Sequence, residues 1–423
     1  MSASGVSRRG LFGAVGVGGA AAGALALSMA AQQPVAAPAL AADAYDFYGP
    51  HQAGIVTPAQ DRMHFAAFDV AAGLDRAGLI GLLQEWTQAA ARMTKGGSAG
   101  ELDAMSGSYD SPPQDTGEAY DLPPSGLTIT FGFGPSLFVD GAGEDRFQIA
   151  QRRPEALERL PHFVGDNLVE NRCDGDLCVQ ACAHDPQVAV HAVRNLTRIA
   201  FGRAVLRWSQ LGFGRTSSTS IAQDTPRNLF GFKDGTMGLR GEQSELVDEY
   251  VWVRPGVDRN AAWLTGGSYL VARKIKMQIE TWDRAPMREQ ETIVGRTKRE
   301  GAPLSGGTEF DQPDFSLPGR QGRPLVDPAS HVALAHPDHN AGVQMLRRGY
   351  NYVDGNDDMG RLSAGLFFIA FVTDPRSHYL PMQSSLSRND LMMEYLQHIG
   401  SGLWAVPRGV RDGEYVGQAL FTA

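Results

Sequence analysis

The same succession of a strand and a helix is predicted once in each half of the chain. In the first half, "MHFAAFDV" (63–70) is typical of a strand, and "LIGLLQEWTQAAARM" (79–93) has apolar residues at helical spacing. In the second half, the pattern predicts a strand over 268–282 and a helix over 287–301. A chain of 423 residues exceeds one typical core. The repetition therefore predicts an α+β fold made of two sandwich domains with ferredoxin-like topology.

The rest of the pattern agrees with two such domains. It predicts strands over 126–134, 204–214 and 365–374, and helices over 186–201 and 386–399. Residues 95–125 are rich in Gly, Ser, Pro and Asp, which predicts an irregular excursion. We place the boundary in the loop 215–240. This gives an N-terminal domain over 43–225 and a C-terminal domain over 226–423.

The N-terminus has the order of an export signal. "SRRGLF" (7–12) precedes an uncharged stretch rich in Gly, Ala and Leu (13–31), and small residues follow at 37–44. This order predicts a secretory signal over 1–42, cleaved within 39–44. The paired Arg8 and Arg9 specify the twin-arginine route, whose cargo folds before export, often around a cofactor. An ordinary signal or a membrane anchor is the alternative. We expect a periplasmic, cell-envelope or secreted protein without stable membrane insertion.

Charge and cysteine content exclude several function classes. The formal net charge is −9, and the leader holds two arginines but no acid, so the remainder is more acidic still. An acidic surface argues against nucleic acid or anionic lipid as the main partner. Three cysteines (Cys173, Cys178 and Cys182) cannot build a disulfide framework. They also lack the four soft ligands of a zinc or iron–sulfur site, so we expect them to be buried apolar residues.

One carboxylate stands between glycines in "GFKDGTMG" (231–238). A glycine-flanked acid such as Asp234 usually closes a turn. The chain also carries His331 in "DPASHVALAHP" and an arginine pair in "LRRGYN" (346–351). A single histidine is more often structural, and that interpretation suits His336 and His339. Yet an imidazole, an arginine and an isolated carboxylate are the groups that a haem peroxidase needs, for iron ligation, O–O polarisation and proton transfer respectively.

These segments resemble the dye-decolourising, or DyP-type, haem peroxidases. The similarity is greatest to the exported deferrochelatase/peroxidase subgroup associated with ferrous iron uptake. It runs from "FYGPHQAGI" (47–55) to the end of the chain. The segments that carry it are "DLCVQACAHDPQVAVHAVRNL" (176–196), "NLFGFKDGT" (228–236), "SHVALAHP" (330–337), "MLRRGYNY" (345–352) and "GLFFIAFVTDP" (365–375).

The resemblance implies a role for each of the three polar residues. Asp234 would be the distal acid–base residue, Arg347 the distal arginine and His331 the axial iron ligand. The cofactor would be haem b, held mainly by the C-terminal domain and not covalently, because the chain has no C-x-x-C-H motif. The family commonly has an arginine two residues after the ligand histidine. This chain has Ala333 there, so we infer no contact with a haem propionate at that position.

Further residues are expected around the cofactor. Glycines at 231 and 235 let the backbone approach a flat macrocycle, and Gly235 and Thr236 are predicted to contact it. Leu366 and Phe368 share one face of their strand, which predicts an apolar wall, while Phe367 points the other way. An axial histidine usually donates its second N–H to a carboxylate. The predicted helix 386–399 offers Asp390 and Glu394, and the resemblance favours Glu394.

The expected activity is reduction of hydrogen peroxide and oxidation of dyes, phenols or other small one-electron donors. An acidic optimum is expected because an aspartate in water titrates near about 3.9. Dyes too bulky for a buried haem would be oxidised at a surface aromatic residue, and the candidates are Trp208, Trp263, Trp282 and Tyr352.

Two other functions remain open. A protein that carries haem, or releases iron from it, would need His331 but not the Asp234–Arg347 pair. Chlorite decomposition on a related α+β fold would need the arginine but no carboxylate, so Asp234 argues against it. The sequence leaves the physiological reductant, any iron-uptake partner and self-association undecided.

Overall fold

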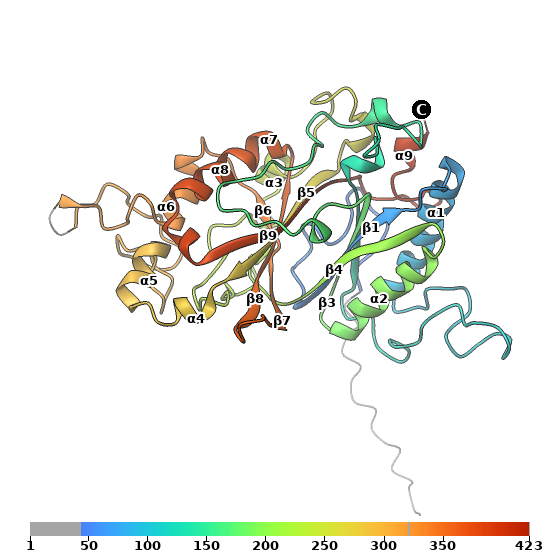
Figure 1. Cartoon of the computed structure of the whole chain (residues 1–423), viewed down its shortest axis with the longest axis horizontal. Coiled ribbons are helices and arrows are strands. Elements are labelled where there is room, and N and C mark those ends of the chain that lie inside the picture. The colour runs from blue at the N-terminus through green and yellow to red at the C-terminus, as the bar shows by residue number, and fades with distance from the viewer. Residues whose placement is uncertain (1–43, 320–321, 423) are drawn as a thin grey trace, which may run out of the picture. The chain divides into compact units, whose positions relative to one another are not determined.

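Nine β-strands form one antiparallel sheet in the computed structural model, which describes residues 44–319 and 322–422 (Figure 1). The predicted leader 1–42 lies outside the described residues. The strands are β1 Arg62–Val70, β2 Thr128–Phe133, β3 Leu177–Ala183, β4 Ala204–Arg215, β5 Ser268–Met277, β6 Leu346–Arg347, β7 Tyr350–Asn356, β8 Leu362–Val372 and β9 Leu396–Val406.

The sheet closes on itself. Its strand order is β5-β9-β2-β3-β1-β4-β7-β8-β6, and β5 also pairs with β8, so eight strands form a ring and β6 extends from β8. The first four strands lie side by side, as do β9, β5, β8 and β7. The first half has the β-α-β-β-α-β element order of a ferredoxin-like motif, and the second half has the same order with the short strand β6 added before β7. The described residues form one compact unit by their contacts, and the division into two domains stays a prediction.

Nine α-helices of the described residues pack around this ring (Figure 1). They are α1 Arg76–Met93, α2 Pro186–Ile199, α3 Ser244–Tyr250, α4 Ile279–Trp282, α5 Met287–Val294, α6 His331–Ala335, α7 Pro375–His378, α8 Leu380–Asn389 and α9 Gln418–Phe421. The two longest begin at capping aspartates, Asp75 and Asp185, whose carboxylates accept from backbone N–H groups of the first turn. Within the described residues, no helix is both long and apolar enough to cross a bilayer.

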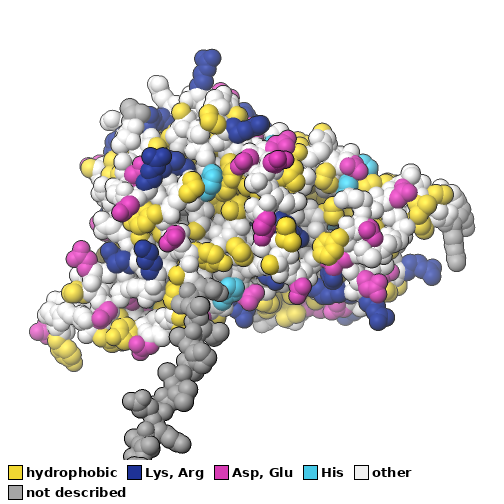
Figure 2. Space-filling model, turned by 180° about the vertical axis from the view of Figure 1, so that it is seen from behind, with side chains coloured by type: hydrophobic (Ala, Val, Ile, Leu, Met, Phe, Trp, Pro, Cys, Tyr) yellow, Lys and Arg dark blue, Asp and Glu magenta, His cyan; other side chains and the backbone are white. Residues whose placement is uncertain are grey.

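The described residues form three apolar cores, and the two larger ones pack on the two faces of the ring. One lies between the sheet and helices α1 and α2 and contains Trp86 and Phe131. The other fills the inside of the ring and contains Phe65 and Trp404. Cys178 and Cys182 belong to this inner core, and all three cysteines are buried and free. On the face shown in Figure 2, acidic and basic side chains are interspersed rather than gathered by sign.

Three of the predicted elements are wrong in extent or in type. The predicted helix 386–399 is wrong beyond Asn389: α8 ends there, a short 3₁₀ helix η7 spans Leu391–Glu394, and strand β9 follows. The strand predicted to reach 282 ends at Met277 and turns into α4. The helix predicted over 287–301 ends at Val294, because Gly295 adopts φ +89° in the left-handed region.

Strand β3 was missed for a physical reason. All seven of its residues are buried, so its two faces show no alternation of polar and apolar side chains. The same problem affects β9, which is buried from His398 to Val406. A short apolar run of this kind does not distinguish a central strand from a buried helix.

Candidate functional site

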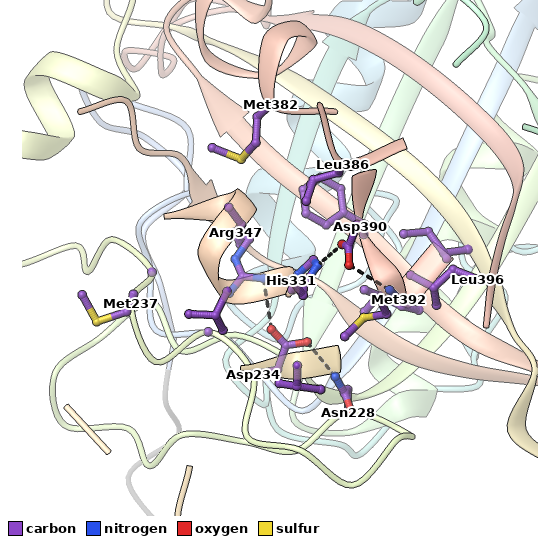
Figure 3. A pocket seen from close by; sticks show the side chains of 18 of the residues that line it. Asn228, Asp234, Met237, His331, Arg347, Met382, Leu386, Asp390, Met392 and Leu396 are labelled. Carbon is purple, nitrogen blue, oxygen red and sulfur yellow. Dashed lines mark hydrogen bonds and ion pairs between the residues drawn. The ribbon is translucent and has the colours of Figure 1, made fainter. Parts of the chain in front are cut away.

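A cavity of about 240 Å³ opens beside the C-terminal half of the sheet. Its wall combines strands β5, β8 and β9 with the loop before α3, helices α6 and α8, and η7. All the residues that the sequence indicated for catalysis or cofactor binding line it together: Asp234, Gly235, Thr236, His331, Arg347, Leu366 and Phe368. Figure 3 shows Asp234, His331 and Arg347 around the same space.

A hairpin turn presents Asp234 to the cavity. Gly231 and Gly235 both have φ +81°, a conformation that residues with a side chain rarely adopt. A Cβ atom on Gly235 would also lie 3.0 Å from Cα of Ser217. The Asp234 N–H donates to the Pro226 carbonyl over 2.9 Å, which closes the hairpin. Asp234 therefore lies in a turn, as a glycine-flanked acid usually does, and also lines the cavity.

Both carboxylate oxygens of Asp234 accept hydrogen bonds. A terminal nitrogen of Arg347 donates to Oδ1 over 3.0 Å, and Nδ2 of Asn228 donates to Oδ2 over 3.1 Å. In Figure 3 the carboxylate lies between these two side chains. The side chain of Asp234 is 15% exposed and that of Arg347 is 26% exposed, so both remain open to a small ligand.

The two arginines of "LRRGYN", at the end of β6, point in opposite directions. Arg347 pairs with Ala370 of β8 and points to the cavity. Its neighbour Arg348 is fully buried and donates to the carbonyls of Ile55 and Thr57. Successive side chains of a strand point to opposite faces. Arg348 therefore fastens the N-terminal segment, and Arg347 is the arginine available at the cavity.

His331 is the first residue of α6. Ser330 caps this short helix by accepting from the Ala333 N–H. Nδ1 of His331 lies 2.6 Å from Oδ2 of Asp390, and the imidazole is 33% exposed. Because a carboxylate accepts at Nδ1, the Nε2 atom is left for a ligand. Ala333, where the resemblance would have an arginine, is fully buried within α6.

The carboxylate that pairs with His331 is Asp390, and not Glu394 as expected from the sequence. Asp390 holds the imidazole, with a side chain only 2% exposed, and its Oδ1 accepts from the Met392 N–H over 2.8 Å. Glu394 is exposed at the far end of η7 and contributes to a separate surface cavity. The predicted helix would have placed Glu394 one turn beyond Asp390. In the structure the chain leaves the helix at Asp390 instead.

The environment of His331 favours its protonated form when no ligand is bound. Burial acts to lower the pKa of the imidazole, but the negative charge of Asp390 and the hydrogen bond to it outweigh burial. Asp234 adds a smaller effect in the same direction, and Arg347 opposes it. The net pKa of His331 is raised. A ligand at Nε2 must therefore compete with a proton.

The remaining wall is mostly apolar, with buried cationic groups set into it. Leu366 and Phe368 line the cavity while Phe367 packs inside the ring, which is the alternation expected from the sequence. Arg273 and Arg296 also line it, and both are buried with terminal or ε nitrogens that lack a hydrogen-bond partner. Sequence analysis did not single out these two arginines or Asn228, because nothing local distinguishes them from structural residues.

Only one of the four candidate aromatic residues contacts a ring that lines the cavity. Trp282 stacks on Phe230, a lining residue, with ring centroids 4.3 Å apart. Trp282 also contacts Phe232, at 5.9 Å, and Tyr395, at 5.1 Å, and the Tyr395 hydroxyl lies 3.1 Å from Oε1 of Glu289. Glu289 lines a second, open cavity of about 640 Å³ between α5 and η7.

The other three aromatic residues lie elsewhere in the fold. Trp208 belongs to the cluster inside the ring, where it contacts Trp404. Trp263 packs on Phe133 and Phe138 in the outer core. Tyr352 is fully buried and donates to the Ile275 carbonyl.

Comparison with known protein families matches both halves of the chain. Residues 52–214 match the family described as "Dyp-type peroxidase, N-terminal". Residues 225–411 match the family described as "Dyp-type peroxidase, C-terminal". Among curated proteins, the chain is similar to "Deferrochelatase" of Escherichia coli O157:H7, with 38% identity over 381 residues, covering 88% of this chain and 86% of that protein. It is also 36% identical to "Deferrochelatase" of Yersinia pestis, covering 89% and 85% of the two chains.

Solved structures show the same fold. Ferric DtpA from Streptomyces lividans superposes with a TM-score of 0.81 at 38% identity, covering 91% of this chain and 99% of that one. A DyP-type peroxidase from Cellulomonas bogoriensis gives a TM-score of 0.79 at 36% identity, covering 90% and 99%. The similarity thus extends over nearly the whole described chain and includes every segment that lines the cavity.

Proposed function

The chain belongs to the Dyp-type peroxidase family, and we propose that it is a haem-dependent enzyme that reduces hydrogen peroxide with electrons from small organic donors. One observation carries the proposal. The cavity that exposes the imidazole of His331 also holds the Asp234–Arg347 pair. An imidazole, a carboxylate and a guanidinium thus face one space, although 113 residues separate Asp234 from Arg347 in the chain.

The residues present suit a haem group. His331 offers Nε2, and the carboxylate at Nδ1 is the usual partner of a metal-bound histidine. Leu366, Phe368 and other apolar side chains provide the wall that a flat macrocycle needs. The unpaired nitrogens of Arg273 and Arg296 are suitable partners for carboxylates such as haem propionates. We infer haem b bound without a covalent link.

Each polar residue would have a separate task. When bound, haem supplies an iron centre at which the O–O bond of peroxide is cleaved. Asp234, as a carboxylate, would accept the proton of one peroxide oxygen and return it to the other. Arg347 would stabilise negative charge on the leaving oxygen. Asp390 would keep the His331 ring in one tautomer and make it a stronger electron donor.

We also propose a pH optimum and a route by which bulky electron donors react. The proton transfer assigned to Asp234 uses a carboxylate, a group whose ordinary titration range is acidic, so we propose an acidic optimum. With haem in this cavity, little room would remain for a bulky dye, so such dyes would react from the surface. The contacts from Phe230 through Trp282 to Tyr395 lead from that cavity to the open groove beside Glu289.

Release of iron from haem is the second candidate function, because curated relatives carry the name "Deferrochelatase". That activity would need haem bound at His331 but no proton transfer by Asp234. Iron loss leaves a fluorescent free porphyrin, so the two functions give different products. If Asp234→Asn stops the reaction with peroxide but leaves porphyrin formation unchanged, the two activities are independent.

Export by the twin-arginine route is a further part of the proposal. It rests on Arg8, Arg9 and the apolar stretch that follows them in the sequence. Folding around a haem before export would explain the use of this route by a protein whose described cysteines are all free.

The central experiment is a haem titration of the purified protein, followed by addition of peroxide. We expect a Soret band that shifts on peroxide addition and returns when a phenolic donor is added. His331→Ala should lose that band or most of the bound haem. Full haem retention with an unchanged spectrum would move the ligand to another residue, with His336 or His339 the next candidates, and absence of haem binding by the wild type would refute the proposal.

A further inference from the structure

The second carboxylate oxygen of Asp234 has a neutral partner. Oδ1 faces the guanidinium of Arg347, whereas Oδ2 accepts from the side-chain amide of Asn228 over 3.1 Å. Asn228 also lines the cavity and lies within the hairpin that the Asp234–Pro226 hydrogen bond closes (Figure 3). It is the only residue besides Arg347, among the described residues, whose side chain is recorded as donating to this carboxylate.

The orientation of the Asn228 amide is fixed by its other contacts. The Phe230 N–H donates to Oδ1 of Asn228 over 3.0 Å, so the oxygen is identified as the acceptor and Nδ2 must face Asp234. A flipped amide would place its oxygen against a carboxylate and lose the bond to Phe230. The backbone of Asn228 is held as well, by Phe232 at its N–H and by Gly231 at its carbonyl. The donor is therefore preorganised.

The charged groups near Asp234 have partners of their own. Lys233, next in the chain, turns to Glu309, and the guanidinium of Arg240 donates to the carbonyls of Ser218, Gly235 and Gly238. His331 lies across the cavity and pairs with Asp390. Arg347 thus supplies the direct charge at Asp234, and Asn228 supplies a directed hydrogen bond without charge.

We propose that Asn228 is a positioning residue for the peroxide reaction: its amide holds the Asp234 carboxylate in one orientation. The inference rests on the proposed function, because it assigns the residue that prepares Asp234 for proton transfer. Arg347 alone would leave the carboxylate free to rotate about a single contact. With both oxygens held, the carboxylate presents its remaining lone pairs in fixed directions to a bound peroxide.

The test compares Asn228→Ala with Asn228→Asp. The alanine variant loses the donor, so we expect the reaction with peroxide to slow by about tenfold, the usual effect of losing a hydrogen bond to a charged group. The aspartate variant keeps the shape but places a second carboxylate beside Asp234. Two adjacent carboxylates titrate as a coupled pair with one apparent pKa raised, so the pH profile of the reaction should move up by about one unit.

A matched control tests whether the effect of Asn228→Asp depends on where the new charge is placed. Asn356→Asp adds the same charge on the exposed end of β7, away from the cavity, and should leave both rate and profile unchanged. Haem content and the Soret band of every variant verify that the fold is kept. An Asn228→Asp profile equal to that of the wild type, or an Asn228→Ala rate equal to it, would overturn the inference.

A second readout does not depend on haem or peroxide. Infrared difference spectra between pH 3 and pH 8, with Asp234→Asn as the reference, isolate the carboxyl band of Asp234. In Asn228→Asp the protonated band should persist to higher pH than in the wild type. If the wild type fails to bind haem but this shift is present, the proposed function is refuted, whereas the positioning of Asp234 by Asn228 is supported. An unchanged band refutes the positioning whatever the activity.

Discussion

Nδ1 of His331 and Oδ2 of Asp390 lie 2.6 Å apart, although 59 residues separate them in the chain. The bond joins the first residue of α6 to the residue that ends α8 and starts η7. It fixes the imidazole so that Nε2 is free for a ligand. The way in which α8 ends therefore decides which carboxylate supports the proposed iron ligand.

The first prediction concerns this bond. Asp390→Asn should lower haem affinity by about 10- to 100-fold, the usual cost of removing the carboxylate behind a metal-bound histidine. The reduction potential of the bound iron should rise, because the imidazole becomes a weaker donor. Spectroscopic haem titration and a redox titration measure the two effects. Glu394→Gln is the matched control, and equal behaviour of the two variants would contradict the assignment.

The second prediction separates the two residues proposed to act on peroxide. Asp234→Asn keeps size and polarity but removes the proton acceptor, so the reaction should slow by roughly a hundred- to ten-thousandfold and lose the acidic limb of its pH profile. Arg347→Leu should slow it by roughly a hundred- to a thousandfold but keep that limb, because Asp234 still titrates. Stopped-flow mixing with peroxide from pH 3 to pH 8 distinguishes the two. An Asp234→Asn variant with the wild-type rate and profile would leave Asp234 as a turn residue only.

The third prediction concerns the aromatic contacts that lead to the surface. Trp282→Phe and Tyr395→Phe should slow oxidation of a bulky anthraquinone dye while the reaction with peroxide stays unchanged, since Trp282 and Tyr395 do not line the cavity. Trp263→Phe, which alters a tryptophan in the outer core, is the control. Steady-state rates with the dye and with a small phenol give the comparison. A dye rate that falls equally in all three variants would argue against this route.

The fourth prediction concerns stability in acid. Burial lowers the pKa of His64 to about 4, and its Nδ1 is buried without a partner. The unfolded chain takes up this proton near pH 6.5 and the folded chain only near pH 4. The free energy of unfolding should therefore fall as the pH drops through this window, by at most about 1.4 kcal/mol per pH unit from this group.

Denaturant titrations at pH 7, 5.5 and 4 measure this loss. His64→Gln should flatten the pH dependence over that window. His184→Gln alters a histidine whose side chain is 46% exposed and should leave the dependence as it is in the wild type. An equal slope in all three proteins would assign the acid sensitivity to other groups.

The fifth prediction tests the leader. Replacing Arg8 and Arg9 by lysine should retain the protein in the cytoplasm, folded and with haem bound, because the twin-arginine route requires the arginine pair. Cell fractionation with haem staining measures the outcome. Replacing Arg62 and Arg76 by lysine, in the body of the chain, is the control for the same change of residue type. Normal export of the leader variant would refute the twin-arginine assignment.

Part of this structure follows from local sequence alone. The hairpin around Asp234 was predictable because glycine is the residue that adopts φ +81° without strain, at both 231 and 235. The alternation of Leu366, Phe367 and Phe368 was predictable because side chains of a strand alternate between its faces. The strand–helix succession of each half was predictable from hydrophobic spacing.

The tertiary structure decided the rest. The hydrogen bond from Arg347 to Asp234 spans 113 residues, and that from Asn228 forms across the hairpin only once its turn is made. The choice of Asp390 over Glu394 depended on where α8 ends, and the pairing of β9 with β5 sets that point. Local spacing determines which residues share a face, but closure of the ring determines which faces meet. The sequence could therefore name the chemical groups of the site, whereas their partners followed only from the packing of segments distant along the chain.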